Sequence, residues 1–433
     1  MLDANQEEKS FPLNGNPPIL QNIAKGQEFP LRPFQYKVLD FQNYDHPHFK
    51  PYTAISLFSG IGGMDLGFLE AGFKVLHASD VEERTVNTYN RNLKCHPAIV
   101  QDIRELDATT LPANPTVILG GFPCQGFSSA GKRRIMDPRN SLAWEFIRVI
   151  RALRPEFIVG ENVLGIRSME HPEGGRVLDR IQADLENLGY KVRIELLNAG
   201  NYGVPQVRKR IFILGALHFN PLIPDDLQEI WREPHPAVTL EQLLGWIPCN
   251  NKSKPLAMAE STIAYPLQHV YKPFSPSDMQ IVQNIPPGGN WKSVPYDKLT
   301  PRLQKMWDNL KKHKSPAFYR RPDLTQVSGT ISATMNPTHC MALHHVENRR
   351  YTVREAAYIQ SFPDKFVFSE NISQAYREIG NAVPPYLAKQ LALLMLGQLE
   401  GRIADKLKFP SDQAEILDSL GKKRPTRVTS NIT

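Results

Sequence analysis

The chain has 433 residues, a net charge of +7 at pH 7, and 22% charged residues. This length exceeds one ordinary core and predicts two or three domains. No apolar run approaches the roughly 20 residues of a membrane helix, and the first residues lack a secretion-signal pattern, so we expect a cytoplasmic protein. The positive charge is compatible with a polyanionic partner. The cysteines form no CxxC pair, which argues against a disulfide framework or a cysteine-rich zinc site.

The first pattern is that of a nucleotide-binding turn. Residues 1–51 show no periodicity and are expected to be a partly ordered arm. Residues 53–58 are apolar and β-prone, the glycine-rich turn SGIGG follows, and residues 64–71 are helical in pattern. Strand, glycine turn and helix are typical of the opening of a doubly wound α/β sheet. A glycine turn alone is weak evidence, because many such turns bind nothing.

Two acids end the next predicted strands. The strand at 74–79 ends in Asp80, twenty residues beyond Gly60, where an acid can accept hydrogen bonds from ribose hydroxyls. Residues 98–100 lead into Asp102, a candidate for an adenine amino group. Either aspartate could instead cap a helix or a turn. A nicotinamide dinucleotide is an alternative ligand for this turn, although the spacing Gly-x-Gly-Gly differs from the pyrophosphate-binding fingerprint.

The central motif is the loop GGFPCQGFSSAGKR at residues 120–133, between a predicted strand at 116–119 and a helix at 141–153. A thiol at Cys124 would lie at the carboxyl end of a parallel strand, where ligands bind in such sheets. A lone cysteine is more often a small buried hydrophobic residue. The flanking glycines and the basic residues Lys132 and Arg133 favour a reactive thiol instead.

Two polar motifs follow. The predicted strand at 157–160 ends in Glu161, whose carboxyl can contact the same bound group as the cysteine loop. Along the extended segment before the strand at 211–217, alternation places Gln206, Arg208 and Arg210 on one face. Arginines that enter a core require an anion or a carboxylate. The alternative is a solvated edge strand.

Together these motifs resemble the DNA (cytosine-5) methyltransferase family over residues 52–399. The residue sequences FSGIGG, Pro-Cys, Glu-Asn-Val, Gln-x-Arg-x-Arg and GNAVPP match, and RYTVREAAYIQSFP departs from its family motif at Tyr351 and Tyr358. The resemblance implies a doubly wound, Rossmann-like α/β domain that uses S-adenosylmethionine, with a smaller irregular target-recognition domain. It also implies double-stranded DNA as substrate, methylation at carbon 5 of cytosine on a flipped-out base, and a monomer. A cognate restriction endonuclease acting on the same site is a possible partner.

Residue roles follow from the resemblance. Cys124 is the expected nucleophile, Glu161 contacts ring nitrogen 3, Arg210 holds the base carbonyl and Arg208 orders the loop. The expected cofactor residues are Phe58, Ser59, Gly60, Ile61, Gly62, Gly63, Asp80, Val81, Asp102, Ile103, Pro123, Asn381 and Ala382. The expected DNA contacts are Gln125, Ser128, Gln206, Lys132 and Arg133.

The predicted domains are an arm at 1–51, a catalytic and cofactor domain at 52–219, a recognition domain at 220–345, a returning segment at 346–400 and a basic tail at 401–433. Basic clusters at 311–314 and 320–321 suit phosphates. Thr352 and Glu355 predict a capping box. The spacing of His339, Cys340, His344 and His345 fits no common zinc pattern, so no metal is expected.

Three alternatives remain at this stage. The same fold and cysteine could act on RNA cytosine, although the long recognition region favours DNA. The chain could be a DNA-binding protein without activity, although Cys124, Glu161, Arg208 and Arg210 are all present. A dehydrogenase is the third.

Overall fold

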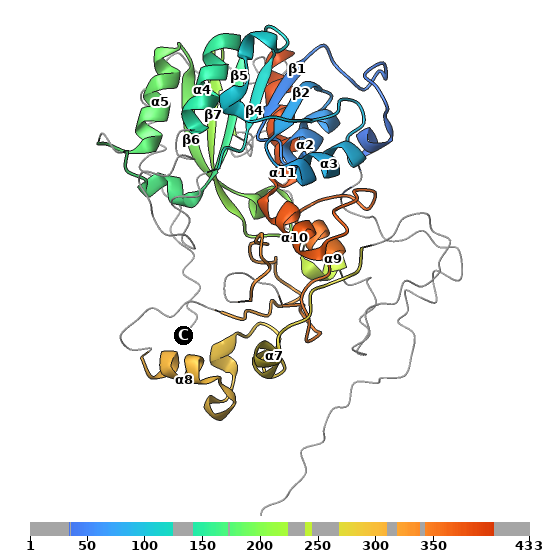
Figure 1. The fold of residues 1–433 in the computed structure, drawn as a ribbon, viewed down its shortest axis with the longest axis vertical. Coiled ribbons are helices and arrows are strands. Elements are labelled where there is room, and N and C mark those ends of the chain that lie inside the picture. Colours follow the sequence, from blue (N-terminus) through green and yellow to red (C-terminus); the bar gives the residue numbers. More distant parts are fainter. Residues whose placement is uncertain are drawn as a thin grey trace, which may run out of the picture.

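The computed structural model describes residues 34, 36–123, 142–171, 174–223, 239–244, 268–309, 318–337 and 343–401 (Figure 1). Several predictions fall on residues outside these ranges. They concern Cys124, Gln125, Ser128, Lys132, Arg133, His339, Cys340, the basic cluster at 311–314 and nearly all of the tail.

Seven strands form one sheet in the part of the chain that the structure describes, in the order β3-β2-β1-β4-β5-β7-β6. Neighbouring strands pair in parallel except where β7 lies antiparallel between β5 and β6. The strands are β1 (Thr53–Leu57), β2 (Lys74–Asp80), β3 (Ile99–Val100), β4 (Val117–Gly120), β5 (Phe157–Val163), β6 (Lys191–Asn198) and β7 (Lys209–Ala216). The doubly wound α/β prediction is confirmed.

Helices cover both faces of this sheet. The α-helices are α2 (Gly63–Ala71), α3 (Glu83–Asn92), α4 (Leu142–Leu153), α5 (Val177–Asn187), α6 (Leu240–Leu244), α7 (Pro276–Val282), α8 (Pro301–Asp308), α9 (Val353–Ile359), α10 (Ile372–Asn381) and α11 (Pro385–Leu399). Short 3-10 helices are η1 (Lys37–Asp40), η2 (Ile103–Glu105), η3 (Ala108–Thr110), η6 (Leu164–Ser168), η7 (Ala199–Tyr202), η9 (Trp291–Ser293) and η10 (Tyr296–Lys298).

The two sides of the sheet bury separate cores. In β4, Val117 and Leu119 join a core with α2, α3 and α11, whereas Ile118 joins a core with α4 and α5. This division follows from the two-residue period of a strand, which sends successive side chains to opposite faces. The central strands therefore carry apolar side chains toward both faces, which is why the sequence shows short apolar runs there.

The C-terminal helix α11 returns to the start of the sheet domain and packs on α2 (Figure 1). A Cβ atom on Gly67 would lie 2.5 Å from the carbonyl oxygen of Pro385, so only glycine allows this approach. In the structure the helix begins at Pro385 and is buried on most of its surface, because it is enclosed in the sheet-domain core.

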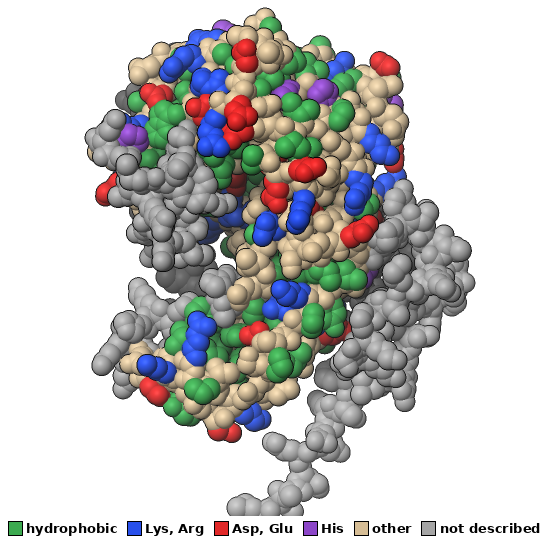
Figure 2. Space-filling view, in the orientation of Figure 1, with side chains coloured by type: hydrophobic (Ala, Val, Ile, Leu, Met, Phe, Trp, Pro, Cys, Tyr) green, Lys and Arg blue, Asp and Glu red, His purple; other side chains and the backbone are tan. Residues whose placement is uncertain are grey.

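A smaller lobe lies beyond α9 and α10 and contains α7 and α8 (Figure 1). Its core packs around Trp291, which is fully buried and in edge contact with Trp307. Both helices are too short to show a clear periodicity in the sequence. Figure 2 shows a hollow between the sheet domain and this lobe.

The arm preceding the sheet is more ordered than the sequence suggested. Phe34, Tyr36, Val38 and Phe49 are buried in the core shared with α2 and α11. The Tyr36 hydroxyl donates a hydrogen bond to the carbonyl oxygen of Ser361 at 3.2 Å. The described part of the arm therefore belongs to the fold. Among the helices that the structure describes, none combines the length and apolarity that spanning a membrane requires.

Candidate active site

The glycine turn after β1 forms the first part of the site. Gly60 and Gly62 adopt left-handed φ angles of 56° and 83°, and Phe58 does so at 55°, which is a strained conformation for a side chain of this size. The amide of Gly60 donates to Asp80 Oδ2 at 3.0 Å, and the amide of Glu82 donates to Asp80 Oδ1 at 2.9 Å. Asp80 thereby ties the turn to the end of β2.

This turn fits a ribose-bearing ligand. Each Asp80 oxygen accepts one of these backbone bonds and keeps a second lone pair, which a hydroxyl group can use. A Cβ atom on Gly60 would meet nothing within 4 Å among the described residues, so the turn borders open space. Burial raises the pKa of the Asp80 carboxyl, while the two amides oppose that rise. Val81 is 67% exposed beside it, an apolar surface suited to a flat ring.

The C-terminal segment closes against the same turn. A Cβ atom on Gly63 would lie 2.4 Å from the carbonyl oxygen of Val383 and 3.2 Å from the Cβ atom of Ala382. Asn381 is exposed at this contact and Ala382 is partly buried. Two segments that are more than 300 residues apart in sequence therefore meet at the glycine turn.

Three other predicted cofactor residues have side chains that are bonded or buried within the protein. Asp102 caps η2 through the amide of Arg104, and the two side chains form an ion pair. The capping alternative therefore describes Asp102 in this structure, and an adenine contact would compete with Arg104. Ile103 is buried, and Ile61 is also buried, so neither apolar side chain is available to a ligand. Ile61 could contribute through its backbone alone.

The register of the sheet brings residues 120–123, which precede Cys124, next to Glu161. Strands β4 and β5 pair Gly120 with Gly160, so the chains leaving these residues run side by side. A Cβ atom on Gly121 would lie 3.8 Å from Glu161 Oε2. Asn162 Nδ2 donates to the carbonyl oxygen of Phe122 at 3.0 Å. Asn162 thereby holds the backbone that leads to Pro123, a positioning role that the sequence alone does not indicate.

Glu161 and Arg210 form the polar centre of the site. Arg210 Nε lies 3.1 Å from Glu161 Oε1, although β7 and β5 are distant in sequence. Burial raises the pKa of the Glu161 carboxyl above its usual value, and the positive charges of Arg210 and Arg208 oppose that rise. Such a carboxyl holds a proton more readily than an exposed glutamate does. Glu161 belongs to β5 itself, which runs through Val163 rather than ending at Gly160 as the sequence suggested.

The Gln-x-Arg-x-Arg segment alternates as predicted, but its buried face points into the protein. Gln206 is 0% and Arg208 1% exposed, whereas Val207 is 39% exposed. Gln206 Nε2 donates to Gln360 Oε1, and Gln206 Oε1 accepts from the amide of Ile331. The predicted DNA contact for Gln206 is therefore wrong for this structure, because its polar atoms are buried and bonded within the chain. Arg208 donates to the backbone carbonyl oxygens of Ile331 and Gly380, and its predicted role in ordering the loop stays a prediction.

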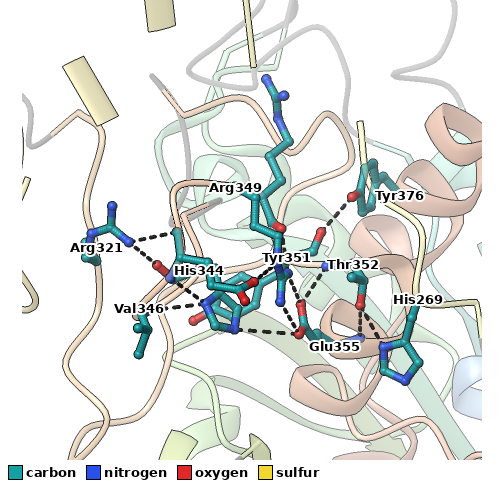
Figure 3. A network of polar contacts seen from close by, with 11 residues as sticks. His269, Arg321, His344, Val346, Arg349, Tyr351, Thr352, Glu355 and Tyr376 are labelled. Carbon is teal, nitrogen blue, oxygen red and sulfur yellow. Dashed lines mark hydrogen bonds and ion pairs between the residues drawn. The ribbon is translucent and has the colours of Figure 1, made fainter. Parts of the chain in front are cut away.

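A polar network joins the small lobe to α9 (Figure 3). Thr352 and Glu355 form the predicted capping box, and Arg349 holds Glu355 with two hydrogen bonds at 2.7 and 2.8 Å. His344 Nδ1 accepts from the amide of Glu347, so its proton resides on Nε2, 3.6 Å from Glu355 Oε1. His344 is thus a buried structural residue.

Arg321, in the predicted phosphate-binding cluster, is 2% exposed and donates to four carbonyl oxygens and to Asn348. The phosphate contact predicted for Arg321 is therefore wrong, because its guanidinium is buried and donates its hydrogen bonds to other residues of the chain. Arg320 is the exposed member of the pair.

Comparison with known proteins places these features in one family. Residues 52–396 match the model of the C-5 cytosine-specific DNA methylases. The chain is 34% identical to the Type II methyltransferase M1.HphI of Haemophilus parahaemolyticus, over 79% of this chain and 86% of that protein. It is also 34% identical to the Type II methyltransferase M.DdeI of Desulfomicrobium norvegicum, over 78% and 87%.

Solved structures show the same fold. A DNA modification methyltransferase encoded within an E. coli prophage superposes with a TM-score of 0.56 at 25% identity, covering 81% of this chain and 99% of that one. The Dnmt2 methyltransferase of S. pombe superposes with a TM-score of 0.52 at 17% identity, covering 81% and 99%. At that lower identity the likeness concerns the fold alone.

Proposed function

Because this chain belongs to the C-5 cytosine-specific DNA methylase family, we propose that it methylates cytosine within one short word of duplex DNA, through a covalent adduct of Cys124 on a flipped-out base. The chain is a DNA (cytosine-5) methyltransferase. Its methyl donor, S-adenosylmethionine, supplies an electrophilic methyl group. The observation that carries the proposal is the Glu161–Arg210 pair beside the backbone that leads to Cys124.

The cysteine solves the main chemical difficulty. Carbon 5 of cytosine is a poor nucleophile, so the ring must be activated first. Addition of the Cys124 thiolate to carbon 6 makes carbon 5 enamine-like and able to take the methyl group. Loss of the proton from carbon 5 then restores the double bond and expels the thiolate. An ordinary thiol has a pKa of about 8.5, and the basic residues Lys132 and Arg133 nearby in sequence would lower it.

Glu161 and Arg210 would stabilise the ring while the adduct exists. Thiolate addition places negative charge on ring nitrogen 3 and the carbonyl oxygen. The Glu161 carboxyl would share a proton with nitrogen 3, which its raised pKa favours. The Arg210 guanidinium would hold the carbonyl oxygen. Arg208 would act indirectly, by fixing the backbone around this strand rather than by touching the base.

The DNA would lie in the hollow between the sheet domain and the small lobe (Figure 2). The target carbon is inaccessible in a duplex, so the base must leave the stack at a cost of a few kcal/mol. Phosphate contacts would offset that cost and make binding salt-dependent. We propose further that the protein acts as a monomer at the nucleoid, as the modification enzyme of a restriction–modification system, with the four domain boundaries given above.

Bisulfite sequencing of DNA from a methylation-free host that expresses this chain tests the proposal. Protected cytosines in one recurrent word are expected. No protected cytosine in DNA would contradict it, and the same assay on host RNA would then test RNA as the substrate. Cys124→Ser should abolish methylation while DNA binding persists. Methyl transfer by that variant would exclude the covalent route.

A further inference from the structure

The buried residues Gln206 and Gln360 form a connection between three segments of the chain. Gln206 Nε2 donates to Gln360 Oε1 at 2.5 Å, and Gln206 Oε1 accepts from the amide of Ile331 at 2.9 Å. Gln360 Nε2 in turn donates to the carbonyl oxygen of Ala382 at 2.6 Å. Both glutamines have no exposed surface. The chain of bonds runs from the segment before β7 through α9 to the segment beside the glycine turn.

Arg208 makes a second connection between the same three segments. Its Nη1 donates to the carbonyl oxygen of Ile331 at 3.2 Å, and its Nη2 donates to that of Gly380 at 2.9 Å. Ile331 is therefore held at both its amide and its carbonyl. A Cβ atom on Gly380 would lie 2.3 Å from the amide nitrogen of Ala333, so these backbones are in direct contact.

One end of this connection, at Ala382, borders the glycine turn. Ala382 and Val383 contact Gly63 and form a wall beside the turn that Asp80 holds through the amide of Gly60. The other end leads to Arg210, two residues beyond Arg208 on the same face of the strand. Replacing a buried side-chain amide that both donates and accepts hydrogen bonds is costly. Each polar group left unpaired destabilises the protein by about 1 to 3 kcal/mol. Gln206 and Gln360 are therefore suited to hold neighbouring backbone segments in place rather than to contact a ligand.

We propose that Gln206 and Gln360 are positioning residues that place the Asn381–Ala382 wall for productive binding of the methyl donor. This inference rests on the proposed function and adds the residues that align the donor site. Gln360 acts through the carbonyl of Ala382, and Gln206 anchors Gln360 to the strand that carries Arg210. The hydrogen bonds from Gln206 through Gln360 to Ala382, here called the relay, set the affinity for the donor. They leave the affinity for DNA unchanged.

Calorimetry of the full chain with S-adenosylmethionine, without DNA, tests the relay. Gln360→Leu should raise the Kd for the donor about tenfold, because it leaves the Ala382 carbonyl unpaired. The KM for the donor should rise in parallel, with kcat at saturating donor and Kd for DNA within about twofold of wild type. Gln398→Leu is the matched control, since Gln398 also donates a single bond to a carbonyl, that of Asn220, away from this wall.

A second variant separates positioning from loss of folding. In Gln360→Glu the ionised carboxylate repels the Ala382 carbonyl, whereas the protonated form can donate to it. Donor affinity should therefore tighten from about pH 8 to about pH 6 in this variant, relative to wild type, because a buried carboxyl titrates in that range. Equal donor affinity in wild type and Gln360→Leu, or a pH profile in Gln360→Glu that follows wild type, would overturn the relay. No donor binding by the wild type would overturn the proposed function together with it.

Discussion

The Glu161 carboxylate and the Arg210 guanidinium meet at 3.1 Å across the antiparallel pairing of β5 and β7. The register pairs Val163 with Arg210, so Glu161 and Arg210 are diagonal neighbours on one face. Burial raises the pKa of this carboxyl in spite of the arginine. A buried carboxyl with a raised pKa and a cation are thus held side by side next to Gly121, where the chain leaves β4.

Replacing Glu161 tests its chemistry. Glu161→Gln keeps the shape but removes the group that shares a proton with the base, so kcat should fall about 10²- to 10⁴-fold. Single-turnover methylation with saturating donor measures this, and DNA affinity should stay near wild type. Glu195→Gln is the control, because Glu195 forms a comparable 3.0 Å pair with Arg193 on β6. Equal loss in both variants would argue against a specific role.

Replacing Asp80 tests the donor site. Asp80→Asn removes one acceptor from the turn, since an amide nitrogen cannot receive the bonds from Gly60 or Glu82. The Kd for S-adenosylmethionine should rise about tenfold by calorimetry. Asp107→Asn is the control, because Asp107 also accepts from an amide two residues on, that of Thr109, on an exposed turn. Unchanged donor affinity in Asp80→Asn would remove Asp80 from the site.

A buried acid under the glycine turn predicts a pH dependence. Asp65 is fully buried, accepts from Ser56 Oγ at 2.6 Å, and has its pKa raised by burial to about 6. The folded state therefore holds this proton more tightly than the unfolded chain. Its stabilising contribution is complete below the unfolded pKa and is lost as pH rises through about 6, for a total of about 3 kcal/mol.

Chemical denaturation of Asp65→Asn across this pH range measures the effect. The free energy of unfolding of the variant, relative to wild type, should increase between about pH 4 and about pH 6.5 and level off above that. Asp297→Asn, at an exposed position, should run parallel to wild type. A constant difference between Asp65→Asn and wild type would mean that Asp65 does not titrate in this window.

The N-terminal arm should contribute to stability. Tyr36→Ala removes a buried ring and its bond to Ser361, so the free energy of unfolding should fall by about 3 to 5 kcal/mol. Tyr36→Phe should lose about 1 kcal/mol, the worth of the hydrogen bond. Urea unfolding measures both, with Lys37→Ala at an exposed neighbouring position as control. A Tyr36→Ala variant as stable as that control would show that the arm is dispensable.

The sequence predicted the central elements well. The strands β1, β2, β4 and β7, the helix α4 and the capping box of Thr352 with Glu355 were all predicted to within three residues. These features depend on local physics, namely apolar runs, glycine turns and caps. The short helices α7 and α8 were not predicted, because their formation depends on packing around Trp291.

By itself the sequence determined the family, the order of the motifs and the residue types that carry the chemistry, since these depend on spacing along the chain. Only the tertiary structure decided which of them meet. It brings Glu161 to Arg210, turns Gln206 inward to Gln360, and buries Arg321 in the small lobe. The physical reason is that alternation along a strand defines two faces, whereas the neighbouring segments decide which face meets solvent.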